Sequence, residues 1–453
     1  MPLRFLNTLS RSLETFTPLD SAGRTVRLYT CGPTVYNFAH IGNFRAYIFE
    51  DLLQRHLEAR GFDVQRVMNL TDVDDKTIRG CREAGIPLTA FTARFKQAFF
   101  EDLDALRIKR ANHFPEATDP AHIARMIAMI SQLEQQGQAY LADDGSVYFR
   151  IARFKNYGRL AHLNLDELRP SGRIKSDEFE KESLGDFALW KAWDEQDGDV
   201  AWESPWGRGR PGWHIECSAM SKALLGDTID LHTGGVDLLF PHHENEIAQS
   251  ECCNGVPFAR HWYHSEHLLV DGTTMSKSKG NYHTLRDLVA KGHEAMAVRY
   301  ALLMGHPRKQ LNFTLDSLHA AASALRTLRA ARAAIPGAGG AVDVSAPVLA
   351  ALRDDLNFPG ALGALFAALN ATAPAELNAA GFDRALFALG LDLSARAPAA
   401  AIPAAVTALA ERRWTAKQAR DFAAADALRA ELAAAGWTML DRKDGWSLEP
   451  VRK

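Results

Sequence analysis

The sequence lacks the features typical of membrane proteins and of disulfide-stabilised secreted proteins. No apolar run among its 453 residues approaches the roughly 20 that a membrane-spanning helix needs. Charges run through the N-terminal stretch and it has no signal-peptide core, so we expect a cytoplasmic protein without a membrane partner. The five cysteines form an odd number and no C-x-x-C pair, which argues against a disulfide framework.

A large excess of one charge is also absent. The formal net charge is −3, and this balance argues against a histone-like coat on nucleic acid. A local basic stripe would still be enough to contact RNA phosphates. The length exceeds what one hydrophobic core usually holds, so we expect two or three domains.

The stretch from residue 26 to residue 61 predicts a strand, a loop and a helix. Residues 26–30 are mostly apolar and precede Gly32-Pro33, which indicates a buried strand that stops abruptly. Apolar residues recur at helical spacing over 44–57, and Gly61 stands where a helix C′ glycine belongs. The loop between them would offer free backbone N–H groups and a positive helix end, both of which favour phosphate.

Two short motifs favour nucleotide chemistry over a plain turn. In the first, HIGN at 40–43, His40 could donate to a phosphate and Gly42 would let a flat ring lie against the backbone. Alone, this loop would fit a tight turn with a core histidine equally well. The second motif is TMSKS at 274–278. The pair resembles the HIGH and KMSKS signatures of class I aminoacyl-tRNA synthetases.

The remaining sequence predicts an α/β protein with an insertion and a helical C-terminal part. Residues 1–115 read as βαβ, and a polar cluster at 69–76 follows the second strand, where an open sheet usually binds ligands. A solvated loop that caps the next helix is the alternative. Residues 116–205 read as an insertion with a helix near 120–136. Residues 206–300 return to strands near 229–232 and 268–270, and alanine-rich helices follow at 301–393. The last segment, 404–453, suggests two short helices and a strand-like tail.

Four residues form a candidate metal site. His242 and Glu246 are four apart after Pro241, so they would share one helical face. Cys217 lies on a predicted helix and Cys31 follows the first strand. Sulfur, nitrogen and oxygen donors together suit Zn²⁺, which binds a thiolate strongly and a neutral alcohol weakly. Singly, each cysteine could be a core residue and the His–Glu pair a surface pair, and Cys81, Cys252 and Cys253 are interpreted as core residues.

The whole set of motifs resembles the cysteinyl-tRNA synthetase family along the length of the chain. The stretches that carry the resemblance are CGPTVY at 31–36, NLTDVDDK at 69–76, GRPGWHIECS at 209–218, FPHHENE at 240–246 and MSKS at 275–278. It implies a Rossmann-type parallel-sheet catalytic domain in two halves, 1–115 and 206–300, around the 116–205 insertion. A helical domain at 301–393 and an anticodon-recognition domain at 404–453 would follow.

The resemblance also implies a role for each motif residue. One Zn²⁺ per chain would be held by Cys31, Cys217, His242 and Glu246. The amino-acid pocket would be lined by Thr71, Trp213 and Asp237. ATP, bound with Mg²⁺, would be contacted by His40, Gly42, Asn43, His232, Gly234, Gly235 and Lys277, of which His40, Asn43 and Lys277 would be catalytic.

The implied reaction activates L-cysteine with ATP and transfers it to tRNA(Cys). The carboxylate would attack the α-phosphate to give cysteinyl-adenylate, and the terminal ribose would then take the acyl group on its 2′-hydroxyl. Zn²⁺ would bind the substrate thiolate, and since shape alone separates near-isosteres by only about 10–200-fold, such a bond removes the need for an editing domain. A monomer is expected.

Two positions depart from the family signatures. Asn43 replaces the last histidine of HIGH, and Thr274 replaces the first lysine of KMSKS. Our hypothesis is that Lys279 partly compensates for the second change. Arg326, Arg329 and Arg332 could form a basic edge or a solvated helix face, and Arg412, Arg413, Trp414, Lys417 and Arg420 suit contact with a single-stranded loop.

Three other functions remain open at the level of sequence. A ligase that joins cysteine to an amino sugar would use the same catalytic motifs, but the basic, aromatic C-terminal segment speaks against it. A zinc hydrolase would leave the nucleotide motifs unexplained. A non-catalytic tRNA-binding relative is disfavoured because His40, Lys277 and all four candidate ligands are present.

Overall fold

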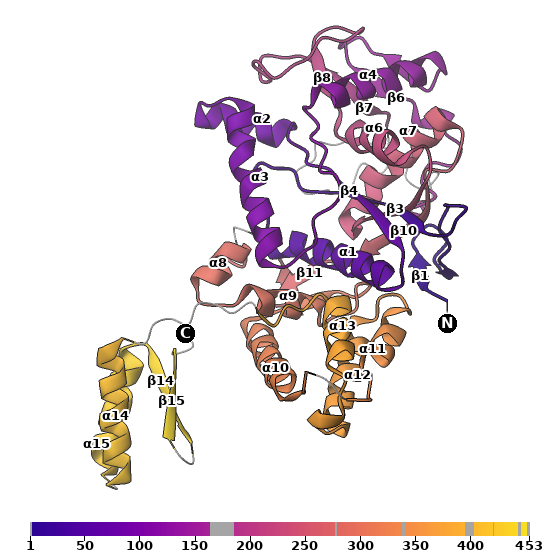
Figure 1. Ribbon diagram of the computed structural model, residues 1–453. Coiled ribbons are helices and arrows are strands. Elements are labelled where there is room, and N and C mark those ends of the chain that lie inside the picture. The colour runs from indigo at the N-terminus through magenta and orange to yellow at the C-terminus, as the bar shows by residue number, and fades with distance from the viewer. Residues whose placement is uncertain are drawn as a thin grey trace. The chain divides into compact units, whose positions relative to one another are not determined.

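The computed structural model describes residues 2–163, 185–276, 279–337, 340–394, 403–419, 421–442 and 445–450. The chain forms two compact units, residues 1–395 and 396–453. Figure 1 shows that the larger unit gathers the insertion elements at one end and a helical bundle at the other. Among the described residues, no helix is both long and apolar enough to cross a membrane.

The larger unit is built on a parallel four-stranded sheet in the order β10-β9-β3-β4. Its strands are β3 (Thr25–Thr30), β4 (Asp63–Met68), β9 (Ile229–Gly235) and β10 (Ala259–Ser265). Strand β3 pairs with β9 in parallel, with Tyr29 opposite His232. The carboxyl ends of two strands about two hundred residues apart in the chain therefore meet at one edge, which confirms the predicted α/β class.

Helix α1 (Ile41–Ala59) connects β3 to β4 and is the best-packed helix of this core. Ile48, Leu52 and Leu57 have no exposed surface, which confirms the buried helix face predicted from the spacing of apolar residues. Gly61 has a φ of +87° and its N–H bonds to the Glu58 carbonyl, as expected of a C′ glycine. The predicted strand–loop–helix unit is confirmed.

The insertion forms its own antiparallel sheet, in the order β5-β6-β7-β8. After α2 (Asp75–Ala84) and α3 (Leu88–Ala105) come α4 (Pro120–Gln135), β5 (Ala139–Leu141), β6 (Val147–Phe149), η1 (Ile151–Arg153), β7 (Phe187–Ala192) and β8 (Gly209–Pro211). The sheet thus continues past residue 205. Because β8 leads within two residues into α6 (Trp213–Leu225), the insertion fixes where that helix begins.

The remainder of the larger unit is mainly helical. A hairpin, β1 (Arg4–Asn7) and β2 (Ser12–Thr15), precedes the sheet, and η2 (Val236–Leu238), η3 (Leu239–His243) and α7 (Glu244–Asn254) follow β9. A small sheet of β11 (Leu268–Val270), β12 (Thr273–Thr274) and β13 (Leu311–Phe313) carries the TMSKS region. The helices after it are α8 (Leu285–Ala290), α9 (Ala295–Leu303), α10 (Leu315–Ala334), α11 (Ser345–Leu352), α12 (Phe358–Ala371), η5 (Pro374–Glu376) and α13 (Ala379–Leu389).

Two of the three arginines considered for a basic edge on α10 are engaged within this unit. Arg329 bonds to Glu294, with an Nη1–Oε2 distance of 3.1 Å, and to the Leu393 carbonyl. Arg332 makes a bidentate pair with Asp383 at 2.7 and 2.9 Å. Their charges are therefore largely matched by acids on neighbouring elements, which weakens the RNA-binding interpretation of that face.

The smaller unit contains α14 (Ala404–Gln418), α15 (Phe422–Ala434) and the hairpin β14 (Trp437–Arg442) and β15 (Gly445–Pro450). Arg413 is 6% exposed and bonds to Asp441, which Lys417 also contacts. Trp414 packs against the small apolar core of the unit. These three residues stabilise the unit, and Arg420 lies outside the described residues.

A buried ion pair joins α1 to α9 inside the larger unit. Asp51 and Arg299 have fully buried side chains and bond to each other, and Asp51 also accepts from Arg55 at 2.8 Å and from the Lys109 N–H at 2.8 Å. Burial alone would raise the pKa of Asp51, but the Arg299 and Arg55 guanidinium groups lower it below its usual range. Removing such a partner leaves an uncompensated charge.

We expect Asp51→Asn to destabilise the larger unit by about 3 kcal/mol, because Arg299 would lose its counter-charge in a dry core. The Tm measured by scanning calorimetry at pH 7 should fall. Since the folded pKa of Asp51 is lowered, the carboxylate contributes stability above the usual aspartate pKa, and this contribution is lost as pH falls through the folded value. The gap between wild type and variant should narrow below about pH 4. A gap that stays constant with pH would contradict this account.

Candidate metal centre and nucleotide loops

Four buried side chains converge at the carboxyl edge of the parallel sheet. Cys31 follows β3, Cys217 lies within α6, and His242 and Glu246 flank the start of α7. One ligand atom from each lies within 4.8 Å of the other three. The His242 Nε2 is 3.0 Å from the Glu246 Oε1, so the two share one helical face, as their spacing predicts.

The electrostatics of this cluster favour a cation. Burial opposes a thiolate at Cys217, yet hydrogen bonds from Cys31 and His242 lower the pKa of Cys217 to about 6. Burial likewise opposes a charged imidazole, but Glu246 and Cys217 raise the pKa of His242 to about 10. Negative charge on Cys217 and Glu246 therefore favours a positive charge between them inside the core. Two sulfurs, one nitrogen and one oxygen are the donors that Zn²⁺ takes in proteins, so the residues fit that ion.

Two further histidines support the same carboxylate and thiol. The His232 Nε2 is 2.8 Å from the Glu246 Oε2, and the His243 Nε2 is 3.3 Å from the Cys31 Sγ. With Cys31 and Glu246 they form a second buried set of metal-ligating groups. His232, which was predicted to contact ATP, is thus in contact with Glu246 and orients it. Sequence reasoning missed His243, for which the only signal was its place beside His242.

The expected amino-acid pocket borders this cluster. Trp213, the first residue of α6, stacks on His242 with ring centroids 4.1 Å apart. Thr71 is 1% exposed and hydrogen-bonds to Glu216 across the site. Asp237 lies in η2, is exposed, and its charge favours protonated His40, while burial lowers the His40 pKa. Thr71 and Trp213 therefore lie on the side of the candidate ligands, and Asp237 lies close enough to His40 to affect its charge.

The HIGN loop caps α1. The His40 Nδ1 accepts from the Asn43 N–H at 3.2 Å, and the Asn43 Oδ1 accepts from the His40 N–H at 3.1 Å. This reciprocal capping box satisfies two backbone donors at the start of the helix. Asn43 therefore has a structural role in the motif that needs only an acceptor atom.

The two signature motifs meet in space. A Cβ on Gly42 would lie 3.0 Å from the His40 ring and 3.1 Å from the Met275 Cε, so glycine is needed where the motifs touch. Similarly, a Cβ on Gly234 would lie 2.9 Å from the His243 ring, and one on Gly235 would lie 2.3 Å from the Asp237 Oδ1. Lys277 lies outside the described residues.

The side chain of Lys279 lies beside Thr274. The Lys279 Nζ is 3.4 Å from the Thr274 Oγ1, and the Lys279 N–H bonds to the Ser276 carbonyl at 3.2 Å. Asn281 holds the same turn by accepting from the Ser276 N–H at 2.8 Å. A cation is thus brought to the place where the family signature has its first lysine.

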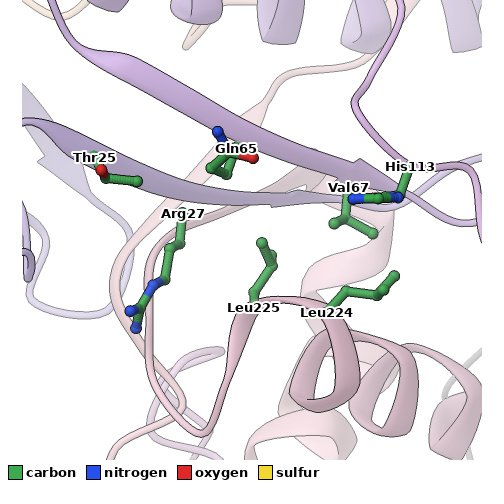
Figure 2. Close-up of a pocket in the computed structure, with 7 residues that line it drawn as sticks. All are labelled: Thr25, Arg27, Gln65, Val67, His113, Leu224 and Leu225. Atoms are coloured by element: carbon green, nitrogen blue, oxygen red, sulfur yellow. The ribbon is translucent and has the colours of Figure 1, made fainter.

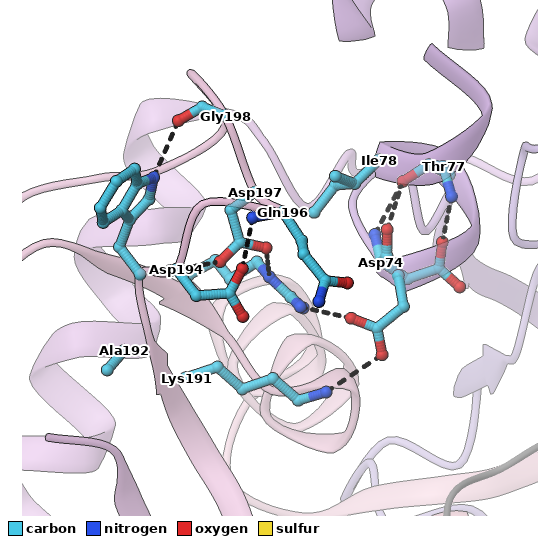
Figure 3. Close-up of polar contacts among 12 residues, drawn as sticks. Asp74, Thr77, Ile78, Lys191, Ala192, Asp194, Gln196, Asp197 and Gly198 are labelled. Carbon is cyan, nitrogen blue, oxygen red and sulfur yellow. Dashed lines mark hydrogen bonds and ion pairs between the residues drawn. The ribbon is translucent and has the colours of Figure 1, made fainter. Parts of the chain in front are cut away.

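An ionic network ties the start of α2 to β8, the strand that precedes α6 (Figure 3). Asp75 pairs with Arg210 and with Lys191, whose Nζ is 3.1 Å from the Asp75 Oδ2. Arg210 also bonds to Asp197 at 2.8 Å. Since Thr71 and Trp213 stand just before Asp75 and just after Arg210, the network fixes the two walls of the pocket relative to each other.

A separate cavity of about 200 Å³ lies between β3, β4 and the end of α6 (Figure 2). It is lined by Thr25, Arg27, Gln65, Val67, His113, Leu224 and Leu225. None of the residues predicted for the site is among them. The candidate site is therefore defined by its side-chain cluster and its two loops.

Comparison with known proteins shows the family of the chain. Residues 17–323 match the family model described as tRNA synthetases class I (C) catalytic domain. A cysteine--tRNA ligase of Opitutus terrae is 59% identical over 100% of both chains. A cysteine--tRNA ligase of Chlamydia pneumoniae is 47% identical over 99% of this chain and 98% of its own.

Solved structures share the fold. A methionyl-tRNA synthetase of Mycobacterium tuberculosis in complex with methionyl-adenylate superposes with a TM-score of 0.58 at 17% identity, over 82% of this chain and 89% of its own. A LeuRS of Agrobacterium radiobacter in a ternary complex with tRNA gives a TM-score of 0.57 at 12% identity, over 83% and 84% of the two chains. The class I parallel-sheet architecture predicted from the motifs is confirmed.

The donor set leads us to expect about one zinc ion bound per chain in the purified protein. Loss of a residue that only hydrogen-bonds to a metal ligand weakens metal binding by roughly 10–100-fold. Cys217→Ser should weaken zinc binding by more than that, because it replaces a ligand itself with a neutral hydroxyl, which binds zinc poorly. Elemental analysis and competition with a chromogenic chelator measure this. Cys253→Ser is the matched control, since Cys253 is buried but belongs to neither ligand set. Equal zinc content in all three proteins would contradict the assignment.

Proposed function

The chain belongs to the cysteine--tRNA ligase family of class I aminoacyl-tRNA synthetases, and on this premise we propose that it joins L-cysteine to tRNA(Cys) with ATP. The observation that carries the proposal is the buried set Cys31, Cys217, His242 and Glu246 beside Trp213. It stands next to the contact between the HIGN and TMSKS motifs. A thiol-selecting site and a nucleotide site would thus share one edge of the sheet.

In this proposal the amino-acid pocket holds cysteine by its two ends. One zinc ion per chain, held by the four ligands, would bind the substrate sulfur as thiolate, which serine cannot offer. Trp213 would form the apolar wall, and the Thr71 hydroxyl would receive the α-ammonium group. Asp237 would act closer to the nucleotide, through His40.

The nucleotide motifs would position ATP, which acts with Mg²⁺. The N-terminus of α1 offers backbone N–H groups to phosphate, and Gly42 would admit the adenine ring once Met275 moves away from it. His40 and Lys277 would stabilise charge on the phosphates as the cysteine carboxylate attacks. The protein would contribute mainly orientation and charge stabilisation. His232 would support Glu246 while Gly234 and Gly235 admit the ribose.

The proposal extends to domains and partners. Residues 1–115 and 206–300 would form the catalytic domain, 116–205 the insertion, 301–393 the stem-side helical domain and 404–453 the anticodon reader. The partners would be tRNA(Cys), ATP and L-cysteine, for a monomer acting in the cytoplasm. The amino-sugar ligase is not favoured, because cysteine--tRNA ligases match the whole chain.

The decisive test is ATP–pyrophosphate exchange followed by charging of total tRNA. We expect exchange with cysteine, a much weaker response to serine, and cysteinyl-tRNA as the product. An amino-sugar acceptor, tested in parallel, should give no ligation. Serine-dependent exchange equal to that with cysteine, or charging of the amino sugar alone, would overturn the proposal.

Lys277→Ala should reduce exchange by at least about a hundredfold, since it removes a cation from the triphosphate. Cysteine binding, measured by calorimetry without ATP, should survive, because Lys277 is assigned to the nucleotide alone. Arg27→Ala, in the separate cavity, is the control and should keep wild-type exchange. Loss of cysteine binding in Lys277→Ala would contradict the assigned role.

Lys279→Ala tests whether this lysine compensates for Thr274. We expect an exchange rate lowered by about tenfold, mainly through KM for ATP, because one cation beside the loop is lost. Restoring a lysine in the double variant Thr274→Lys with Lys279→Ala should recover most of the rate. An unchanged rate in Lys279→Ala would contradict compensation.

A further inference from the structure

A chain of hydrogen bonds crosses the site between the neighbours of its two cysteines. The Gly32 N–H donates to the Asn69 Oδ1 at 2.9 Å, and the Asn69 Nδ2 donates to the Thr71 Oγ1 at 3.2 Å. The Thr71 hydroxyl then donates to the Glu216 Oε2 at 2.9 Å. Gly32 follows Cys31 and Glu216 precedes Cys217, so the chain spans the candidate metal centre.

The members of this chain are buried. Asn69 is 2% exposed, Thr71 is 1% exposed and Glu216 has no exposed surface. On α6, Glu216 follows Trp213 by three residues, so it lies on the helix face that also carries Trp213. The Glu216 carboxyl group is therefore directed toward the site and away from solvent.

The hydrogen-bonding capacity of Thr71 decides what remains for a ligand. A threonine hydroxyl has one donor and two acceptor positions. In the structure the Thr71 hydroxyl donates to the Glu216 carboxyl oxygen and accepts from the Asn69 amide nitrogen. One acceptor position is left, and a positively charged ammonium group is the complementary partner.

Among the residues that the structure describes, no other hydrogen bond of the Glu216 side chain explains its burial. Its second carboxyl oxygen makes no hydrogen bond among the residues that the structure describes. A carboxyl group buried with one hydrogen bond is costly, and such costs concentrate at functional positions. The single bond that it makes is the one that sets the direction of the Thr71 hydroxyl.

We propose that Glu216 is a positioning residue for substrate recognition, which acts through Thr71. By accepting the hydrogen bond of the Thr71 hydroxyl, Glu216 turns the free lone pair of Thr71 toward the α-ammonium group of the amino acid. Without that acceptor the hydroxyl proton could rotate into the pocket and oppose the ammonium charge. The inference rests on the proposed function, because it needs Thr71 in the amino-acid pocket.

The test measures KM for cysteine and KM for ATP by pyrophosphate exchange in the full-length, zinc-loaded protein. Glu216→Met has similar length and no acceptor, and should raise KM for cysteine about tenfold with little change in kcat or in KM for ATP. Glu216→Gln keeps an oxygen of the same shape and should restore most of the affinity. Ser221→Ala changes another buried polar group of α6 and is the matched control, expected to leave both KM values unchanged.

A double-mutant cycle separates positioning from general damage. Thr71→Val should raise KM for cysteine, and Glu216→Met should add nothing to it, because the hydroxyl that it orients is already gone. Zinc content, measured on every variant, should stay at the wild-type level. Additive effects, or an unchanged KM for cysteine in either Glu216→Met or Thr71→Val, would overturn the inference.

The outcome also distinguishes this inference from the proposed function. If the wild type fails to bind or activate cysteine, both are wrong. If the wild type activates cysteine and Glu216→Met does so with the same KM, only the role of Glu216 is wrong. Should Glu216→Met fail to fold, the comparison of Thr71→Val with Thr71→Ser decides, since serine keeps the oriented hydroxyl and should retain wild-type KM.

Discussion

The candidate site depends on the burial of one carboxylate and two thiol groups at a place that water cannot reach. Cys31, Cys217 and Glu246 are all at most 5% exposed, and their mutual repulsion would favour opening the site. Buried charges of one sign persist only when a cation, a proton or a donor neutralises them. His242 and His232 supply donors, and a metal ion would supply much more. The surrounding elements are arranged so that these groups cannot move apart.

The parallel sheet makes that arrangement possible. Strands β3 and β9 end side by side, so the loop with Cys31 and the turn that leads to α7 meet at one edge. The start of α6 is fixed independently by the insertion, through the Arg210 pairs with Asp75 and Asp197. The insertion thereby positions Trp213 over His242, although none of its described residues belongs to either ligand set. The fold therefore sets the geometry of the site through the adjacent strand ends and the ion pairs of Arg210.

Local patterns in the sequence predicted much of this. The apolar spacing and Gly61 placed α1, and the four-residue spacing put His242 and Glu246 on one face. The contacts that sequence reasoning missed are all between distant segments. Glu216 reads as an ordinary helical carboxylate until Thr71 is brought beside it from the segment that follows β4. Arg413 and Trp414 read as RNA contacts, yet they stabilise their own unit, because burial depends on which elements pack around them.

By itself the sequence determined the α/β class, the two nucleotide motifs and a set of four candidate metal ligands, and the family resemblance of its motifs implied the parallel sheet. Only the tertiary structure decided that His232 and His243 support the candidate ligands and that Met275 packs on Gly42. These facts depend on distances between residues far apart in the chain. Such distances are set by how strands pair and helices pack, and no local pattern encodes them.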